Sequence, residues 1–170
     1  MRVIQTLGGT FLSNLSISGN TICTAGKMGG FPPGRIRQLT VQGQAPQRVL
    51  LYAGLNDVMF YVPVEVFQAE YCLLLSRLRQ AYPQAQVFCG TLLLGEVAGT
   101  QGSLRGVLQR MAPYNEAIRA AAAQEGGLLV DLAAQSTRYL ALDAFHPTGE
   151  GMVQLAACWL RAMKAAGYAP

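Results

Sequence analysis

The chain carries one histidine, His146, which follows Asp143 by three residues. A carboxylate at this spacing in a loop can fold back on the imidazole and accept its N–H. That contact would fix the tautomer of the ring and stabilise the imidazolium that forms when histidine acts as a general base. Asp143 and His146 therefore indicate two members of a hydrolytic triad, with a loop histidine beside an incidental acid as the alternative. Asp131 is a competing partner for His146, but the three-residue offset favours Asp143.

Composition limits the classes of protein to which the chain can belong. Its 170 residues suffice for one sizeable core, so we expect a single domain over residues 1–170. Although 51% of the residues are hydrophobic, no apolar run reaches the ~18 residues that a membrane span needs. The net charge of +4 comes from scattered basic residues, a pattern that argues against nucleic-acid binding. We expect a soluble protein with a cytoplasmic location; a secretion signal would have been lost with any missing N-terminal block.

Cofactor and metal sites find no support in the sequence. One histidine and four widely separated cysteines provide too few grouped ligands for zinc. The segment Gly26 to Gly30 is rich in glycine but lacks the spacing of a phosphate loop, and we interpret it as a mobile loop. We therefore predict no metal and no organic cofactor.

Hydrophobic periodicity predicts an α/β protein, in which short apolar strands alternate with longer amphipathic helices. One helix, from Pro63 to Tyr82, repeats apolar residues at spacings of three and four. The terminal helix is expected to turn one apolar face inward, made of Met152, Val153, Ala156, Trp159, Leu160 and Met163. The predicted strands are residues 12–18, 47–53, 86–94 and 128–132, and the predicted helices are residues 63–82, 106–124 and 150–166.

Three of the polar segments that follow these strands form a recognisable set. They are Ser18-Gly19-Asn20-Thr21, Gly54-Leu55-Asn56-Asp57 and Asp143-Ala144-Phe145-His146. In this order they resemble the second, third and fifth blocks of the SGNH (GDSL) hydrolases, a family of small esterases, lipases and acylhydrolases. The resemblance implies a three-layer α/β/α sandwich with a mainly parallel, flavodoxin-like sheet. It also implies a small-molecule ester or acyl substrate.

In that family the glycine N–H and the asparagine amide bind the oxyanion, so the resemblance assigns these roles to Gly19 and Asn56. Each donor of such a pair stabilises an acyl-transfer transition state by ~2.7 to 4 kcal/mol. The resemblance likewise makes His146 the general base and Asp143 its orienting carboxylate. Taken singly, Asn56 with Asp57 is equally typical of a turn.

The family's nucleophile, a serine in a Gly-Asp-Ser block after the central strand, has no counterpart in this chain. Thr10 in Leu7-Gly8-Gly9-Thr10 is the candidate substitute. This alternative takes residues 2–7 as the first strand and places Thr10 where the family has its serine. However, a parallel crossover needs about a dozen residues, and only a handful separate Leu7 from the strand predicted at Leu12. The better interpretation makes residues 2–7 the end of a helix that Gly8 or Gly9 terminates, so the usual first strand is missing.

Several explanations remain open. The chain is an N-terminally shortened member, a non-catalytic relative that keeps the pocket for a ligand or partner, or an enzyme that recruited Thr10, Ser13, Ser16 or Ser18. A flavodoxin-like binder of a phosphorylated ligand is a remoter rival. Whether the chain is an active enzyme is therefore uncertain.

A missing central strand would leave unpaired edges. We predict that residues 47–53 pair directly with residues 12–18, or that residues 2–7 or a second copy of the chain fills the gap. A homodimer is thus a hypothesis.

Overall fold

Three short apolar strands form an all-parallel sheet in the computed structural model, which describes residues 2–23, 30–97, 105–135 and 138–168. Their order is β1-β2-β3, and the register pairs Val49 with Val87 and Cys89 with Leu129. The strands predicted at residues 47–53, 86–94 and 128–132 are confirmed but shorter. Their bounds are β1 (Arg48–Leu51), β2 (Gln86–Gly90) and β3 (Leu128–Val130). Most of the segment interpreted as a mobile loop, residues 26–30, lies outside the described residues.

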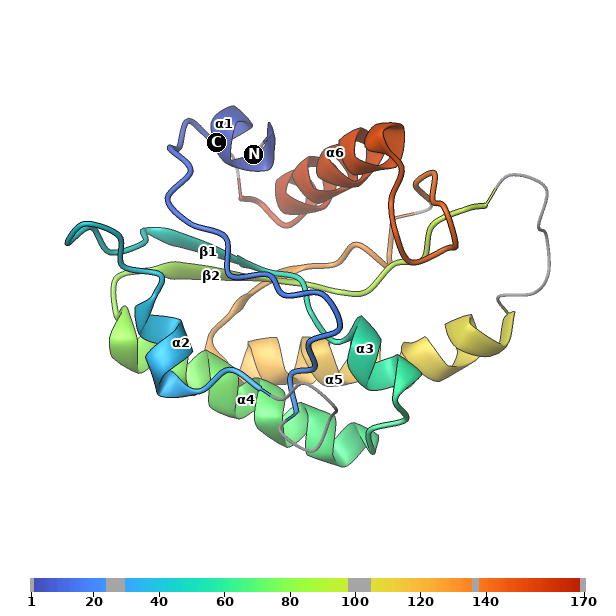
Figure 1. The fold of residues 1–170 in the computed structure, drawn as a ribbon, viewed down its shortest axis with the longest axis horizontal. Coiled ribbons are helices and arrows are strands. Elements are labelled where there is room, and N and C mark those ends of the chain that lie inside the picture. The colour runs from blue at the N-terminus through green and yellow to red at the C-terminus, as the bar shows by residue number, and fades with distance from the viewer. Residues whose placement is uncertain (1, 24–29, 98–104, 136–137, 169–170) are drawn as a thin grey trace.

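Helices cover both faces of the sheet, so the protein has three layers (Figure 1). The helices α1 and α6 pack together on one face, and α4 and α5 pack together on the other. Each face has its own cluster of buried apolar side chains. This arrangement confirms the predicted α/β class. The helices are α1 (Arg2–Thr6), α2 (Pro33–Arg37), α3 (Leu55–Met59), α4 (Val64–Ala81), α5 (Arg105–Glu125) and α6 (Gly149–Ala165).

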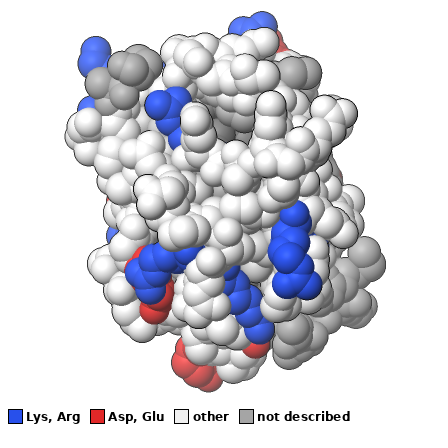
Figure 2. Space-filling view, turned by 90° about the vertical axis from the view of Figure 1, so that its left-hand side faces the viewer, with Lys and Arg blue, Asp and Glu red and all other residues white. Residues whose placement is uncertain are grey.

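No helix in the described part of the chain is long and apolar enough to cross a membrane. Figure 2 shows the face at the amino-terminal ends of the strands, where Lys and Arg side chains lie in separate groups, some beside Asp or Glu. This face lies at the opposite end of the sheet from α3 and the chain that follows β2 (Figure 1).

The helix α1 confirms the interpretation of residues 2–7 as the end of a helix. Gly8 adopts a left-handed conformation with φ of 68°, and its N–H donates to the Gln5 carbonyl at 3.0 Å. Gly9 donates to the Ile4 carbonyl at 2.9 Å. A glycine at this position ends helices because it adopts positive φ without a steric penalty.

The strand predicted at residues 12–18 is wrong, because this segment is irregular and pairs with no strand. Its backbone is bound by side chains instead: the Asn14 side chain accepts from the Ser16 N–H at 2.9 Å, and the Leu15 carbonyl accepts from the Arg35 guanidinium at 2.5 Å. An Asx-type contact offers the backbone an alternative to a strand ladder. The predicted direct pairing of residues 47–53 with this segment is therefore also wrong.

The inward face predicted for α6 is only partly right. Trp159 and Met163 are buried, but Met152 and Val153 are 58% and 38% exposed. The reason is Gly151, where an added Cβ would lie 1.8 Å from the Leu140 carbonyl oxygen. The helix turns this bare backbone toward the preceding loop, and the neighbouring apolar side chains face solvent.

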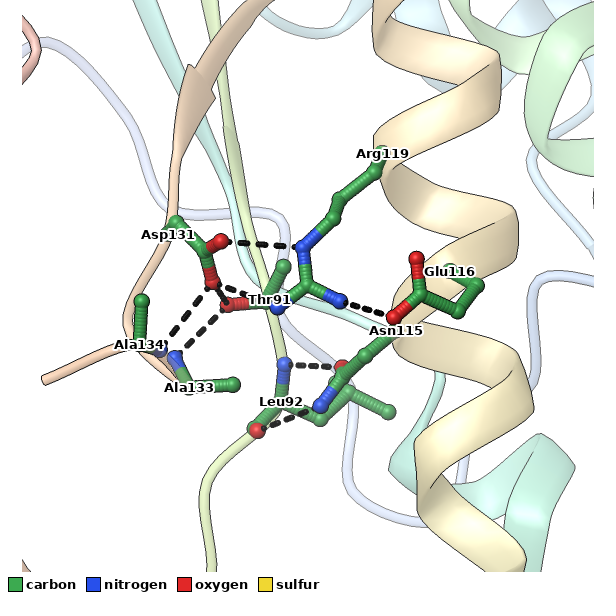
Figure 3. A network of polar contacts seen from close by, with 8 residues as sticks. All are labelled: Thr91, Leu92, Asn115, Glu116, Arg119, Asp131, Ala133 and Ala134. Carbon is green, nitrogen blue, oxygen red and sulfur yellow. Dashed lines mark hydrogen bonds and ion pairs between the residues drawn. The ribbon is translucent and has the colours of Figure 1, made fainter.

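In the described part of the chain, no strand pairs with the segment that continues beyond Thr91, and a side chain supplies its hydrogen bonds instead. The Asn115 amide accepts from the Leu92 N–H at 2.7 Å and donates to the Leu92 carbonyl at 3.1 Å (Figure 3). Both partners are buried. Buried backbone groups need such partners, so Asn115 holds the extended segment after β2 against α5.

Beside this contact, an ion pair joins the end of β3 to α5 (Figure 3). The Asp131 carboxylate accepts from the Arg119 Nε and Nη2 atoms at 2.9 Å each. It also accepts from the Thr91 hydroxyl at 3.0 Å, which itself accepts from the Ala133 N–H. The network fixes the carboxyl ends of β2 and β3 relative to each other.

A hairpin of residues 139–147, called the site hairpin below, attaches to the same segment. Glu96 donates its N–H to the Tyr139 carbonyl at 2.7 Å and accepts from the Ala141 N–H at 2.9 Å. Within the hairpin, Ala141 pairs with Pro147 in an antiparallel bridge. Gly95 is needed here, because an added Cβ would lie 2.4 Å from the Ala141 Cβ and 2.9 Å from the Tyr139 carbonyl.

The Asp131 network makes the free energy of unfolding depend on pH. Burial raises the pKa of Asp131, but hydrogen bonds from Arg119 and Thr91 outweigh it and hold the pKa below its ordinary value. A carboxylate with a lowered folded pKa stabilises the fold above its unfolded pKa of ~3.9, and this contribution is lost as pH falls through the folded value. We expect Asp131→Asn to cost about 1 to 2 kcal/mol at pH 7 and to flatten the loss of stability between pH ~5 and ~2, measured by urea unfolding.

Glu116→Gln is the matched control, because Glu116 also binds Arg119 but is 74% exposed. Such a surface pair contributes about 0 to 1 kcal/mol. If Asp131→Asn lost stability with falling pH as the wild type does, the Asp131 carboxylate would not be the cause of that loss.

The close approach at Gly95 gives a second prediction. Gly95→Ala should lower the free energy of unfolding by about 1 to 3 kcal/mol, because the methyl group overpacks the contact with the site hairpin. Gly149→Ala is the control, since nothing lies within 4 Å of its added Cβ. That change in the first turn of α6 should be neutral or stabilising by about 0.5 to 1 kcal/mol. Chemical denaturation measures the free energy of unfolding of both variants. Equal values for the two would contradict the close packing of Gly95 against the site hairpin.

Candidate active site

The site hairpin brings Asp143 against His146. The imidazole Nδ1 lies 2.8 Å from one carboxylate oxygen and 3.1 Å from the other. The same carboxylate accepts the backbone N–H groups of Phe145 and His146 at 3.0 and 2.9 Å. Ala144 between them has a φ of 73°, so the backbone turns back within three residues.

Electrostatics at the pair favour an ionised carboxylate. The hydrogen bond from His146, followed by the two backbone N–H bonds, lowers the pKa of Asp143 to about 2. The imidazole is 70% exposed. With Nδ1 bound to the carboxylate, the Nε2 atom is left as the basic nitrogen of the neutral ring. Asp131, the competing partner, is bound to Arg119 instead.

Asn56 lies in the first turn of α3, directly after the end of β1. The turn that leads to it needs Gly54, which has a φ of 125° and would place an added Cβ 2.9 Å from the Phe67 ring. The Asn56 amide donates one N–H to the Asn20 carbonyl at 2.8 Å. The amide carries two N–H bonds, and within the described residues the second makes no hydrogen bond.

Gly19 lies beside this contact. It has a φ of 75°, and the Asn20 N–H closes a turn on the Ile17 carbonyl at 3.2 Å. In the described part of the chain, no hydrogen bond uses the Gly19 N–H. The structure therefore brings Gly19 and Asn56 together through Asn20.

Asp57 joins the same two segments, and the sequence analysis gave it no role. Its side chain is fully buried and accepts the N–H groups of Ile22 and Cys23 at 2.9 and 3.1 Å. A carboxylate that binds two backbone N–H groups replaces the strand ladder that the irregular N-terminal segment lacks. The signal for it was Asn-Asp at a strand end, which is also the signal for an ordinary turn.

Two tyrosines that the sequence analysis missed connect Asn56 and the site hairpin. The Tyr52 hydroxyl accepts from the Leu93 N–H at 3.1 Å and donates to the Leu93 carbonyl at 3.3 Å. The Tyr139 hydroxyl lies 3.5 Å from the carbonyls of Leu93 and Phe145. An aromatic residue with a polar tip after an apolar strand was the only available signal. Through these contacts, α3 and the site hairpin lie at the same end of the sheet, beyond the carboxyl ends of the strands (Figure 1).

Thr10 lies near the opposite end of the sheet, where β1 begins. The Leu7 carbonyl accepts from the side chain of Arg48, the first residue of β1, at 2.9 Å. Leu7 packs in the cluster that contains Met163. Three residues span at most ~10 Å, whereas the site hairpin attaches well beyond the end of β2. The placement of Leu7 therefore gives Thr10 no contact with His146.

The described part of the chain does not group the side chains that commonly bind metal ions. Among the residues that the structure describes, no three His, Cys, Asp or Glu side chains are grouped closely enough to hold an ion. Cys23 and Cys89 are buried, and burial raises the pKa of both thiols, so neither resembles a reactive thiolate.

Similar architectures occur among solved structures. The crystal structure of TesA matches with a TM-score of 0.58 at 17% identity, over 79% of this chain and 71% of its own. LAE5, an α/β hydrolase from the metagenome of Lake Arreo, matches with a TM-score of 0.53 at 25% identity, over 89% and 70%. Axe2, an acetylxylan esterase from Geobacillus stearothermophilus, matches with a TM-score of 0.52 at 20% identity, over 75% and 67%. These likenesses confirm the fold.

A search of curated proteins finds no match. The sequence profile of the GDSL-like lipase/acylhydrolase family, in contrast, matches residues 2–153. That match takes in the segments of Gly19, Asn56 and His146 and most of the chain, and the protein therefore belongs to the GDSL-like lipase/acylhydrolase family.

Proposed function

We propose that the protein hydrolyses a small-molecule ester, with His146 as the general base and Asp143 as its orienting carboxylate. The observation that carries the proposal is the 2.8 Å contact between the imidazole Nδ1 and the Asp143 carboxylate. It leaves Nε2 on an imidazole that solvent, and hence a substrate, can reach. Membership of a lipase and acylhydrolase family agrees with ester chemistry.

The proposed chemistry follows from these groups. His146 takes the proton of an attacking O–H as its oxygen bonds to the ester carbonyl carbon, and Asp143 stabilises the imidazolium. The Gly19 N–H and the Asn56 amide would donate to the resulting oxyanion, each worth about 2.7 to 4 kcal/mol in the transition state. The imidazolium then returns its proton to the departing alcohol oxygen as the bond from that oxygen to the acyl carbon breaks. Where the attacking O–H belongs to a side chain, water repeats both steps on the acyl-enzyme, with His146 again as the base, and releases the acid. Acyl-sugar esters are one substrate class to try, because Axe2 is an acetylxylan esterase.

The nucleophile is the open part of this proposal. In the described residues no serine or threonine hydroxyl binds His146, and the position of Leu7 speaks against Thr10. Ser18, which is exposed and precedes Gly19, is better placed beside the proposed oxyanion donors. A relative without a nucleophile would bind acyl ligands without turnover.

One experiment separates these cases. Purified protein is assayed with chromogenic acetyl esters and treated with a fluorophosphonate, whose adduct is located by peptide mapping. We expect activity that His146→Ala abolishes and that Asp143→Asn lowers by roughly 10³- to 10⁴-fold, because the ring loses its oriented tautomer. Glu150→Gln, which changes an exposed carboxylate on the first turn of α6, is the control and should keep wild-type activity.

An adduct on a serine or threonine would identify the nucleophile. Hydrolysis that persists in His146→Ala would overturn the assignment of the base. A folded protein with neither activity nor adduct would leave the binding relative as the function.

We also infer that two copies associate through β1. The Gln47 carbonyl accepts from the Gln86 N–H, so alternate residues of β1 face β2. By that alternation Arg48 and Leu50 direct their backbone groups to the other edge, where no described strand pairs. Unpaired edges favour association of copies.

Light scattering after size exclusion tests this association. We expect a mass of about twice 18.2 kDa at micromolar concentrations. A monomer at every concentration would contradict it and leave the esterase proposal untouched.

A further inference from the structure

Leu93 is the point at which the Asn56 segment and the His146 segment meet. Its N–H and its carbonyl both bind the Tyr52 hydroxyl, at 3.1 and 3.3 Å. The Tyr139 hydroxyl approaches the same carbonyl at 3.5 Å. Leu93 belongs to no strand ladder, so these hydroxyl groups supply the partners that its buried backbone needs.

From Tyr52 the connection to Asn56 is short and stiff. Only three residues intervene, and one of them, Gly54, packs against the Phe67 ring with no room for a side chain. From Leu93 the connection to His146 is also short. Two residues later, the Gly95 N–H donates to the carbonyl of Ala144 at 2.8 Å, inside the turn that holds Asp143 and His146.

The Tyr52 side chain is itself held firmly. Its ring packs edge-on against the Trp159 ring, with 6.1 Å between the ring centroids. The space for this pair comes from Gly90, where an added Cβ would lie 2.5 Å from the Trp159 ring and 3.2 Å from the Tyr52 ring. Burial raises the pKa of the Tyr52 hydroxyl, so it keeps its proton and donates at neutral pH.

We propose that Tyr52 is a positioning residue whose hydroxyl sets the distance between the oxyanion donor Asn56 and the base His146. The inference rests on the proposed ester hydrolysis for its effect on rate, but the geometry it describes does not. In the described chain, the Tyr52 hydroxyl makes its hydrogen bonds to Leu93 and none to His146 or Asn56. It acts through the Leu93 backbone, from which the attachment of the site hairpin is two residues away.

The expected effect is on the rate constant of the bound complex. Misplacing catalytic groups by about 1 Å can cost on the order of 10²-fold in rate. Loss of one hydroxyl should therefore lower kcat by about 10- to 100-fold, while KM, which depends on the binding surface, changes little.

Tyr52→Phe is the test, because it removes the hydroxyl and keeps the ring that packs on Trp159. Tyr82→Phe is the matched control. Like the Tyr52 hydroxyl, the Tyr82 hydroxyl binds two backbone groups, in its case the carbonyls of Ile36 and Arg37 at 3.1 and 3.3 Å. Tyr82 caps α4 just before β2 begins, at the opposite end of the sheet from the site hairpin.

Three readouts are compared between the variants: kcat and KM for an acetyl ester, the NMR signals of the imidazole, and hydrogen exchange of the Gly95 amide. Because the chain has one histidine, the imidazole signals need no assignment. In Tyr52→Phe we expect the lower kcat, shifted imidazole signals and exchange at Gly95 faster by about tenfold. In Tyr82→Phe all three should match the wild type, even where overall stability falls.

Wild-type imidazole signals and Gly95 exchange in Tyr52→Phe, or equal changes in Tyr82→Phe, would overturn the inference. Absence of esterase activity in the wild type would refute the proposed function alone, since the two NMR readouts still decide the role of Tyr52. If Tyr52→Phe does not fold, Tyr139→Phe replaces it. This variant removes the other hydroxyl at the Leu93 carbonyl, and it should speed exchange at Gly95 by less than tenfold because its contact with that carbonyl is longer; unchanged exchange would overturn the inference.

Discussion

The candidate site depends on how the backbone after β2 is hydrogen-bonded once the neighbouring strands have ended. Asn115 pairs with both backbone groups of Leu92, and the Tyr52 hydroxyl pairs with both groups of Leu93. An unpaired buried group would cost about 1 to 3 kcal/mol, so these contacts allow the chain to run on past the sheet. They also tie its course to α5 on one side and to the end of β1 on the other. The site hairpin is attached to this segment and takes its position from it.

A similar substitution of side chains for strand pairing holds the other half of the site. The N-terminal segment pairs with no strand in the described chain, yet Asp57 binds the N–H groups of Ile22 and Cys23 and Asn56 binds the Asn20 carbonyl. A buried carboxylate that accepts two backbone N–H groups is satisfied where an isolated one would not be. Gly19 is therefore held beside Asn56 by two adjacent residues of α3.

What the sequence predicted well is what local periodicity determines. The three long helices α4, α5 and α6 and the three strands follow from apolar spacing, and the contact of Asp143 with His146 follows from an offset of three residues. What it missed depends on long-range contacts. Residues 12–18 alternate like a strand but have no strand beside them, and Met152 and Val153 are turned outward because Gly151 packs its backbone against Leu140. The roles of Tyr52 and Tyr139 require knowing that Leu93 lies between them, which spacing along the chain does not reveal.

The two halves of the site are thus held by different means. The Asp143 and His146 pair is closed within four residues by its own backbone bonds and needs little from the rest of the protein. The spacing from His146 to Asn56 instead passes through Leu93 and Gly95 and depends on tertiary packing. A base without an aligned oxyanion donor loses most of the stabilisation that acyl transfer needs. For the proposed ester chemistry, the contacts at Leu93, and not the Asp143 and His146 pair alone, are therefore what aligns the proposed base with the proposed oxyanion donor.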